Sequence, residues 1–183
     1  MSWKIRQAAQ ILRKGGLIAY PTEAVYGLGC LAHFHNTIER LLKIKQRPAE
    51  KGLILLASDL SQLDDYIQPP PPDILAKVRY TWPGPITWLF PAREHVPELI
   101  TGKHDSIAVR ISAHPVVNEL CRRSQAPLIS TSANLSGKHM AYSAFEVRRQ
   151  FDNQLDYILN APLGRQDKPS KIIDALSGQV IRS

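Results

Sequence analysis

Residues 128–137, Leu-Ile-Ser-Thr-Ser-Ala-Asn-Leu-Ser-Gly, join a short apolar run to a turn rich in hydroxyl groups. The run Leu128–Ser130 has the length and composition of a buried strand. Helical spacing of apolar residues predicts a helix over Val116–Arg123 before it, and a Ser-x-x-Glu capping box predicts a helix over Ala144–Phe151 after it. A strand between two helices indicates a layered fold in which helices cover a sheet.

The same alternation extends along most of the chain. Strands are predicted at Leu17–Tyr20, Leu53–Ala57, Thr87–Phe90 and Ser106–Ile111. Helices are predicted at Ser2–Lys14, from an N-cap at Asn36 to before Pro48, at Ser58–Tyr66 and at Asp73–Tyr80. The sequence therefore predicts the α/β class, with mixed α+β layers, a twisted sheet and connections that cross over it.

Length and composition indicate one globular domain over residues 1–183, because 44% of the residues are hydrophobic and 21% are charged. The chain has 23 Lys and Arg against 16 Asp and Glu, which gives a formal net charge of +7. Such a surface attracts polyanions, for example nucleic acid or nucleotide phosphates. The charge indicates a class of partner and leaves the reaction open.

The sequence also bears on location. Its longest aliphatic stretch, Leu53–Ala57, is far shorter than the roughly 20 residues that a membrane-spanning helix needs. Basic residues interrupt the apolar ones near the N-terminus, which is unlike a secretory signal. Cys30 and Cys121 lack the spacing of a disulfide framework or a zinc site. We expect a cytoplasmic protein that does not associate with membranes.

Polar groups at predicted strand ends are the first candidates for a site, since α/β proteins bind ligands there. Thr22 and Glu23 follow the first strand, and Gly27 and Gly29 would let the backbone pass close to a ligand. An ordinary turn before a helix explains the same residues equally well. Both interpretations remain open on these residues alone.

A second candidate is basic. Lys43, Lys45, Arg47 and Lys51 gather at a predicted helix end and in the loop after it. Arginine forks and lysine point charges can hold a triphosphate. A solvated helix C-terminus also favours basic residues, because they interact well with the helix dipole.

Two further candidates lie on predicted strands. Arg110 points to the same side of its strand as Ser106 and Ala108, and a strand arginine needs an anionic partner, either a protein carboxylate or a ligand. The turn Ser130–Gly137 offers hydroxyl and amide groups that suit phosphate oxygens or a small polar substrate. A capping turn would account for only one or two of these groups.

Several common chemistries have no signature in this sequence. It contains no Walker A loop, no Rossmann glycine fingerprint and no HExxH pair. Ser130 and Ser132 do not lie in a GxSxG elbow. We therefore expect neither a covalent nucleophile nor a protein-held metal.

Taken together and in order, several stretches resemble the YrdC family in its short bacterial form, over nearly the whole chain. They are Pro21–Gly29, Lys45–Pro48, Lys51–Leu53, Trp82–Pro85 with Thr87, Val109–Arg110, Ser130–Gly137 and Pro169–Ser170. The resemblance implies a single YrdC-like domain with flanking helices and a basic concave cleft.

The resemblance also implies an activity. It is that of a nucleotidyltransferase that condenses L-threonine, bicarbonate or CO2, and ATP into threonylcarbamoyl-adenylate and pyrophosphate. The product serves the N6-threonylcarbamoyladenosine modification of tRNA. Mg2+ bound with ATP, tRNA or double-stranded RNA, and downstream proteins that transfer the threonylcarbamoyl group are the other implied partners.

Site residues follow from the resemblance position by position. Those implied for ATP are Lys45, Arg47, Lys51, Ser106, Ser132, Asn134 and Arg182, and those implied for L-threonine are Thr22, Arg110, Ser130 and Ser170. The chain departs from the family pattern at Ala24, Lys51-Gly52, Leu56 and Lys171, where relatives carry Thr, Asn-Pro, His and Thr. These departures concern contacts to threonine.

Two other functions fit parts of the sequence. A non-catalytic protein could bind double-stranded RNA or tRNA through phosphate contacts on a basic concave face. A carbamoyl-adenylate-forming module, like the YrdC-like part of hydrogenase maturation factors, would use carbamoyl phosphate in place of threonine. Assays that omit one substrate at a time separate these functions.

Overall fold

Helices and strands alternate along the chain and build one mixed sheet with helices on both faces. The computed structural model describes residues 2–151 and 153–182. The α-helices within these ranges are α1 (Ser2–Arg13), α2 (His35–Lys45), α3 (Pro72–Thr81), α4 (Glu98–Thr101), α5 (Pro115–Ser124) and α6 (Ala144–Phe151), and short 3-10 helices span Ala49–Lys51 and Leu60–Leu63. None of the helices described combines the length and apolar character needed to cross a membrane.

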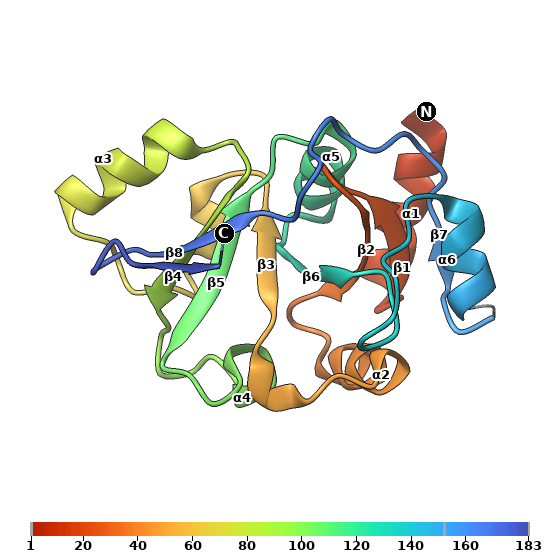
Figure 1. The fold of residues 1–183 in the computed structure, drawn as a ribbon, viewed down its shortest axis with the longest axis horizontal. Coiled ribbons are helices and arrows are strands. Elements are labelled where there is room, and N and C mark those ends of the chain that lie inside the picture. Colours follow the sequence, from red (N-terminus) through yellow and green to blue (C-terminus); the bar gives the residue numbers. More distant parts are fainter. Residues whose placement is uncertain (1, 152, 183) are drawn as a thin grey trace.

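The strands of the described residues join in the order β7-β1-β2-β6-β3-β5-β4-β8-β9 (Figure 1). Their bounds are β1 (Ile18–Pro21), β2 (Tyr26–Leu31), β3 (Ile54–Ala57), β4 (Ile86–Pro91), β5 (Ser106–Ile111), β6 (Leu128–Ser132), β7 (Tyr157–Ile158), β8 (Lys171–Asp174) and β9 (Val180–Arg182). In the middle of the sheet, β3 runs parallel to β5 and antiparallel to β6. The predicted α/β class with mixed layers is confirmed.

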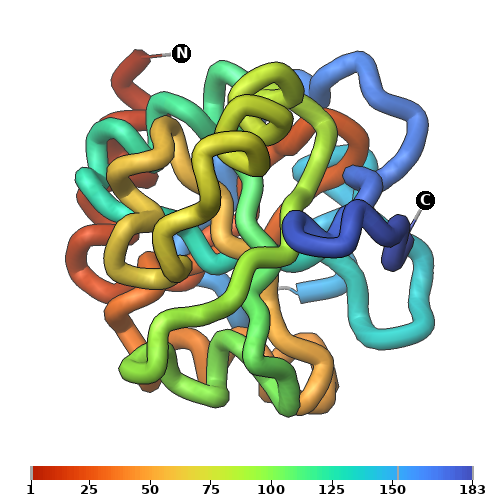
Figure 2. Tube along the Cα trace, turned by 90° about the vertical axis from the view of Figure 1, so that its left-hand side faces the viewer, coloured from red at the N-terminus to blue at the C-terminus, as the bar shows by residue number. Residues whose placement is uncertain are grey.

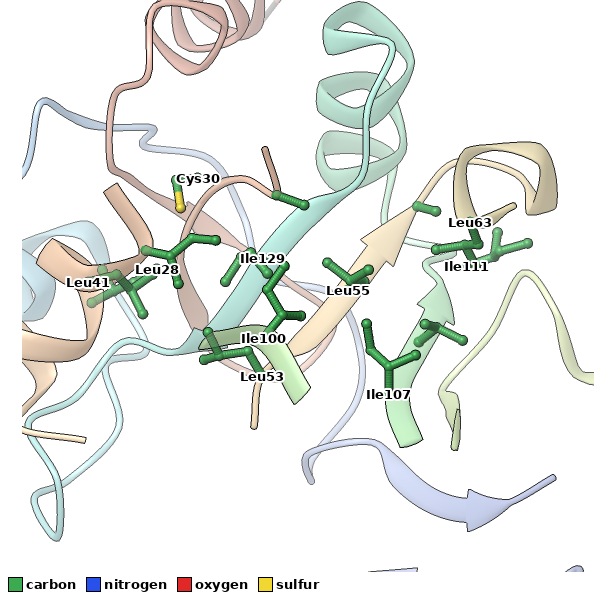
Figure 3. Packing of buried hydrophobic residues seen from close by; sticks show 14 of the residues in the cluster. Leu28, Cys30, Leu41, Leu53, Leu55, Leu63, Ile100, Ile107, Ile111 and Ile129 are labelled. Carbon is green, nitrogen blue, oxygen red and sulfur yellow. The ribbon is translucent and has the colours of Figure 1, made fainter. Parts of the chain in front are cut away.

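One face of the sheet carries the larger core. Figure 3 shows Leu55, Ile107 and Ile129 projecting from β3, β5 and β6 into this core, where Leu41 of α2 and Ile100 of α4 also lie. All five side chains are buried. The apolar run of β3 does not alternate with polar residues because its other side is covered as well.

Helices α1 and α5 cover part of the opposite face. Leu12 of α1 and Leu120 of α5 belong to a second core with Tyr20, Leu56 and Leu128 of the sheet. Burial of such side chains stabilises the fold by about 1.5–3 kcal/mol each. This face continues past the two helices across β2, β6, β3 and β5, and there it borders the pocket described below.

The structure differs from the sequence predictions in several elements. Strand β2 lies where a ligand-binding turn was considered, and it places Gly29 inside the sheet. Phe34 occupies the N-cap position of α2 and makes no side-chain capping hydrogen bond, so the prediction of Asn36 as the cap is wrong. Only a 3-10 turn over Leu60–Leu63 forms in the predicted helix Ser58–Tyr66.

Gly29 illustrates why β2 needs glycine. A Cβ atom at this position would lie 2.2 Å from the carbonyl oxygen of Ile129 and 2.8 Å from the hydroxyl of Tyr20. The Tyr20 ring, and not a ligand, therefore occupies the space beside this backbone. At Gly27 the nearest atoms, in Ser130 and Thr22, would be 3.3 Å away.

We expect Gly29→Ala to lower the free energy of unfolding by about 3 kcal/mol, because overpacking against a backbone carbonyl cannot relax through a side-chain rotation. Gly27→Ala is the matched control, and its cost should be about 1 kcal/mol or less. Urea denaturation of both variants measures the difference. Equal midpoints for the two variants would contradict this account of β2.

Candidate functional site

The exposed part of the sheet forms the floor of a pocket with a volume of about 210 Å3. This is below the roughly 300–1,000 Å3 of a typical ligand pocket, so a nucleotide and an amino acid together would extend onto the surface. Figure 2 shows the loop after β6, the segment before β8 and the C-terminal segment on one side of the molecule. Residues from these three segments line the pocket.

The floor and walls come from distant parts of the sequence. Gly27 of β2, Ser130 and Ser132 of β6, and Arg110 of β5 lie on the sheet, where Gly27 pairs with Ser132. The predicted residues that line the pocket are Thr22, Arg47, Arg110, Ser130, Ser132, Ser170 and Arg182. The fold thus brings most of the predicted site together.

Two predicted residues lie behind the lining. The ammonium group of Lys45 is buried, with the residue 3% exposed, and donates to the carbonyl oxygens of Ser132 at 2.5 Å and Asn134 at 2.7 Å. The Ser132 hydroxyl donates to Oδ1 of Asn134 at 2.6 Å. Lys45 and Asn134 therefore hold the loop at the end of β6. Lys45 acts on the pocket indirectly, by holding this loop in position.

Burial and, to a smaller extent, the nearby positive charge of Arg47 together lower the pKa of Lys45 to about 8. A protonated amine makes stronger hydrogen bonds to the two carbonyl groups than a neutral amine does. The hold of Lys45 on the loop is therefore expected to weaken as the pH rises above about 8.

Lys51 and Ser106 do not line the pocket. Ser106 begins β5, four residues before Arg110, and a strand covers about 13 Å over that distance. Lys51 ends a 3-10 turn, and its side chain is exposed. The alternation of side chains along the strand predicts that Ser106 lies on the same face as Arg110. It does not show how far along that face the pocket extends.

Arg110 has a protein partner that sequence reasoning did not identify. Its Nη2 donates to Oε2 of Glu23 at 3.0 Å, across 87 positions of sequence, and Oε1 of Glu23 accepts from the Ser112 hydroxyl at 2.7 Å. Both charged side chains are nearly buried. Nε of Arg110 is buried and finds no hydrogen-bond partner among the described residues. Because Nε is enclosed, the donors that remain for a ligand in the pocket are the N–H groups of the Nη atoms that Glu23 does not use.

Two further arginines converge on the pocket. Nη2 of Arg47 donates to the carbonyl of Gly52 at 2.9 Å, and Nη2 of Arg182 donates to the carbonyl of Ser170 at 2.7 Å. Partial burial, followed by the charges of Arg110 and Arg47, lowers the pKa of Arg182. Like charges gathered in one cleft favour a polyanionic ligand.

The sequence predictions missed several lining residues. Met140, Gln166 and Lys168 line the pocket from irregular segments. Such segments lack the periodicity from which a side-chain direction can be predicted. The backbone N–H of Gln166 donates to the Glu23 carbonyl at 3.1 Å, which fixes this segment beside the pocket.

Known proteins resemble this chain closely. The family model described as "Telomere recombination", which covers Sua5, YciO and YrdC proteins, matches residues 10–183. A Pseudomonas aeruginosa protein named threonylcarbamoyl-AMP synthase is 49% identical over 181 residues, which cover 99% of this chain and 97% of that protein.

Two solved structures share the fold. Sua5 of P. abyssi, complexed with L-threonine, has 38% identity and a TM-score of 0.89; the match covers 95% of this chain and 51% of that one. The chain therefore spans about half the length of Sua5. Escherichia coli YciO has 32% identity and a TM-score of 0.84, with 98% and 88% of the two chains covered. Because the family model and these relatives all match along nearly the whole chain, it belongs to the Sua5/YciO/YrdC family.

Proposed function

We propose that this chain is a threonylcarbamoyl-AMP synthase, which converts L-threonine, bicarbonate or CO2, and ATP into threonylcarbamoyl-adenylate and pyrophosphate. The observation that carries the proposal is one basic pocket lined by two kinds of charged group: the buried Arg110–Glu23 ion pair, and the arginines Arg47 and Arg182, which have no carboxylate partner among the described ion pairs. We assign the amino acid to the ion pair, and call this the amino-acid end of the pocket. We assign the triphosphate to Arg47 and Arg182, and call this the nucleotide or phosphate end.

At the amino-acid end, Arg110 would bind the threonine carboxylate through the Nη N–H groups that Glu23 leaves unpaired. Ser130 and Ser170 line the same pocket and would donate or accept hydrogen bonds. The Thr22 hydroxyl donates to the carbonyl of Val25 at 2.7 Å, so Thr22 would offer threonine an acceptor rather than a donor. The L-threonine bound in Sua5 of P. abyssi supports an amino acid in this family's pocket.

At the nucleotide end, Arg47, Arg182 and the Ser132 hydroxyl would contact the phosphates of ATP. Lys45 and Asn134 would act by holding the loop that carries Ser132. Lys51 and Ser106 would meet ATP only where the nucleotide extends beyond the pocket. Some of the predicted ATP residues would thus contact the nucleotide directly, and the others would act by positioning the residues that do.

The chemistry needs positioning and charge neutralisation more than covalent help. The threonine amine attacks CO2 and loses a proton, giving a carbamate. A carbamate oxygen then attacks the α-phosphorus as the bond to pyrophosphate breaks. Neither Ser130 nor Ser132 forms a covalent bond in this scheme, and the arginines offset the negative charge that develops on the phosphates.

Magnesium would enter with ATP. Of the described residues that line the pocket, Glu23 alone carries a carboxylate, and both of its oxygens accept hydrogen bonds from Arg110 and Ser112. The pocket thus does not fit a magnesium ion held by protein side chains alone. Phosphate oxygens and water would supply most ligands of the MgATP substrate.

Mass spectrometry of the product made from ATP, L-threonine and bicarbonate tests the proposal. Threonylcarbamoyl-adenylate should form only when all three are present. Carbamoyl phosphate should not replace threonine and bicarbonate, as it would in a carbamoyl-adenylate-forming module. Binding of RNA with no product from the complete mixture would favour the non-catalytic alternative.

The proposed reaction belongs to one YrdC-like domain over residues 1–183 in the cytoplasm. Cys30 and Cys121 are both free and buried, which suits a reducing compartment. Further proteins would transfer the threonylcarbamoyl group from the product to tRNA. Because the formal net charge is +7, the protein would also attract the phosphates of tRNA directly.

A pH profile tests the role of Lys45. Since its pKa is lowered to about 8, Lys45 is protonated below that pH and loses its charge above it. We expect kcat/KM for ATP, which reports ionisations of the free enzyme, to fall above about pH 8. In Lys45→Met, kcat/KM for ATP should be low already at pH 7 and should show no further decrease above pH 8. If the decrease above pH 8 persists in the variant, it is caused by the ionisation of another group.

A further inference from the structure

Glu23 stands out because it is an acid in a basic pocket. Among the described residues that line the pocket, the other charged groups are Arg47, Arg110, Lys168 and Arg182. Glu23 is 8% exposed. Burying a carboxylate costs free energy, and its negative charge also weakens the binding of phosphate groups nearby. Its position therefore indicates a specific role.

Three hydrogen bonds hold Glu23, two at its carboxylate and one at its backbone carbonyl. Oε2 accepts from Arg110, and Oε1 accepts from the Ser112 hydroxyl, which itself accepts from the backbone N–H of His114 at 3.1 Å. The Glu23 backbone carbonyl accepts from the N–H of Gln166. The carboxylate and the Arg110 guanidinium therefore form a unit with a fixed orientation.

This unit has no net charge, although both of its ends are charged. A phosphate group at Arg110 would meet the negative charge of Glu23 within about 3–5 Å, and like charges at this distance repel strongly in a partly buried site. Arg47 and Arg182 have no carboxylate partner among the ion pairs of residues 2–151 and 153–182. A triphosphate is therefore drawn to those arginines and away from Arg110.

A zwitterion has the opposite preference. An α-amino acid carries its carboxylate and its amine on one carbon atom, so a carboxylate at the unpaired Nη donors of Arg110 keeps the ammonium group close to Glu23. The Arg110 guanidinium and the Glu23 carboxylate together match the carboxylate and the ammonium group of the amino acid. The Arg110–Glu23 pair is thus complementary to a zwitterion, whereas Arg47 and Arg182 are complementary to an anion.

We propose that Glu23 is a positioning and specificity-determining residue that divides the basic pocket into a phosphate end and an amino-acid end. It holds Arg110 in orientation, excludes phosphate from this guanidinium and selects a zwitterionic α-amino acid. This inference rests on the proposed synthase function and adds the basis on which the two substrates are kept apart.

Glu23→Gln tests the inference, because it keeps the size of the side chain and removes its charge. Product formation is followed by chromatography at constant free Mg2+, with inorganic phosphate as the inhibitor. In the unchanged protein, phosphate should compete with ATP and not with threonine. In Glu23→Gln, the KM for threonine should rise at least tenfold, the KM for ATP should change less than twofold, and phosphate should compete with threonine as well.

Two further variants complete the test. Glu119→Gln removes a carboxylate that pairs with Arg122 and Arg123 on the surface, and it should change neither KM nor the inhibition pattern. Ser112→Ala leaves the charge of Glu23 in place but removes one of its donors. It should raise the KM for threonine about threefold without letting phosphate compete with threonine.

The outcomes separate the two proposals. If the unchanged protein makes no threonylcarbamoyl-adenylate, the proposed function fails. If it makes the product, but Glu23→Gln leaves phosphate competitive with ATP alone, the role of Glu23 is wrong and the synthase function stands. An equal rise in both KM values would indicate a merely structural role and would also overturn the inference. Should Glu23→Gln not fold, an unchanged KM for threonine in Ser112→Ala would overturn it.

Discussion

Replacing Arg110 with lysine is expected to raise the KM for threonine about 30- to 150-fold, which corresponds to the roughly 2–3 kcal/mol of a charge-assisted bidentate contact. Lysine keeps a positive charge beside Glu23, yet it lacks the planar fork with which arginine can bind two groups at once. The KM for ATP should change little. Initial rates of product formation, measured with each substrate varied in turn, give both constants.

Arg110→Ala should behave differently, because it leaves the buried Glu23 without its cation. Breaking a buried ion pair from one side costs about 3–5 kcal/mol, so this variant should lose stability as well as activity. The sequence alone left open whether a protein carboxylate or a ligand is the partner of Arg110, and no local signal points to Glu23, 87 positions away. A folded Arg110→Lys protein with a near-normal KM for threonine would rule out a carboxylate contact at this arginine.

Core strands were predictable because their local sequence agrees with their burial. Ser106–Ile111 was predicted with the bounds that β5 has, and Leu53–Ala57 overlaps β3 almost completely. Both strands lie in the centre of the sheet, where apolar runs without proline or glycine have few alternatives. The helix Ala144–Phe151 also matches α6, and the N–H of Glu146 donates to the Ser143 hydroxyl as a capping box requires.

Strands at other positions were missed for physical reasons. β2 contains Gly27 and Gly29, which locally indicate a turn, and tertiary contacts with Tyr20 and β6 decide that it is a strand. β8 and β9 lie at the edge of the sheet, and each residue of β9 is largely exposed, so neither strand shows a buried apolar pattern. β8 is placed by pairing with β4 and β9 by pairing with β8, and no local signal encodes either pairing.

For the site, the sequence identified segments but not contacts. Lys45 bonds to Ser132 across 87 positions, and Arg110 bonds to Glu23 across the same separation. The local sequence around each residue marked it as a candidate for the site. Its electrostatic role, however, depends on a partner that is distant in the sequence. In the structure, Lys45 donates to two carbonyl groups of the loop after β6, and Arg110 forms an ion pair with Glu23.

The electrostatics of the other arginines lead to a second large effect. Arg47 shares the cleft with Arg182 and Arg110, and its Nε is buried without a hydrogen-bond partner in the part of the chain that the structure describes. Burial lowers the pKa of Arg47, and the pKa of Arg182 is lowered in part by the charge of Arg47. These cations destabilise one another in the free protein, and a polyanion would relieve the repulsion.

We therefore expect Arg47→Met to reduce kcat/KM for ATP about 10- to 100-fold, equivalent to roughly 1.5–3 kcal/mol for a lost charged hydrogen bond, and to leave the melting temperature unchanged or higher. Arg40→Met is the matched control on α2, because Arg40 pairs with Asp156 at the surface, 2.8 Å away. It should leave the kinetics for ATP unchanged. A loss of stability in Arg47→Met that parallels its loss of activity would mean that Arg47 serves the fold through its bond to Gly52, and that the phosphate end of the pocket must be assigned to other residues.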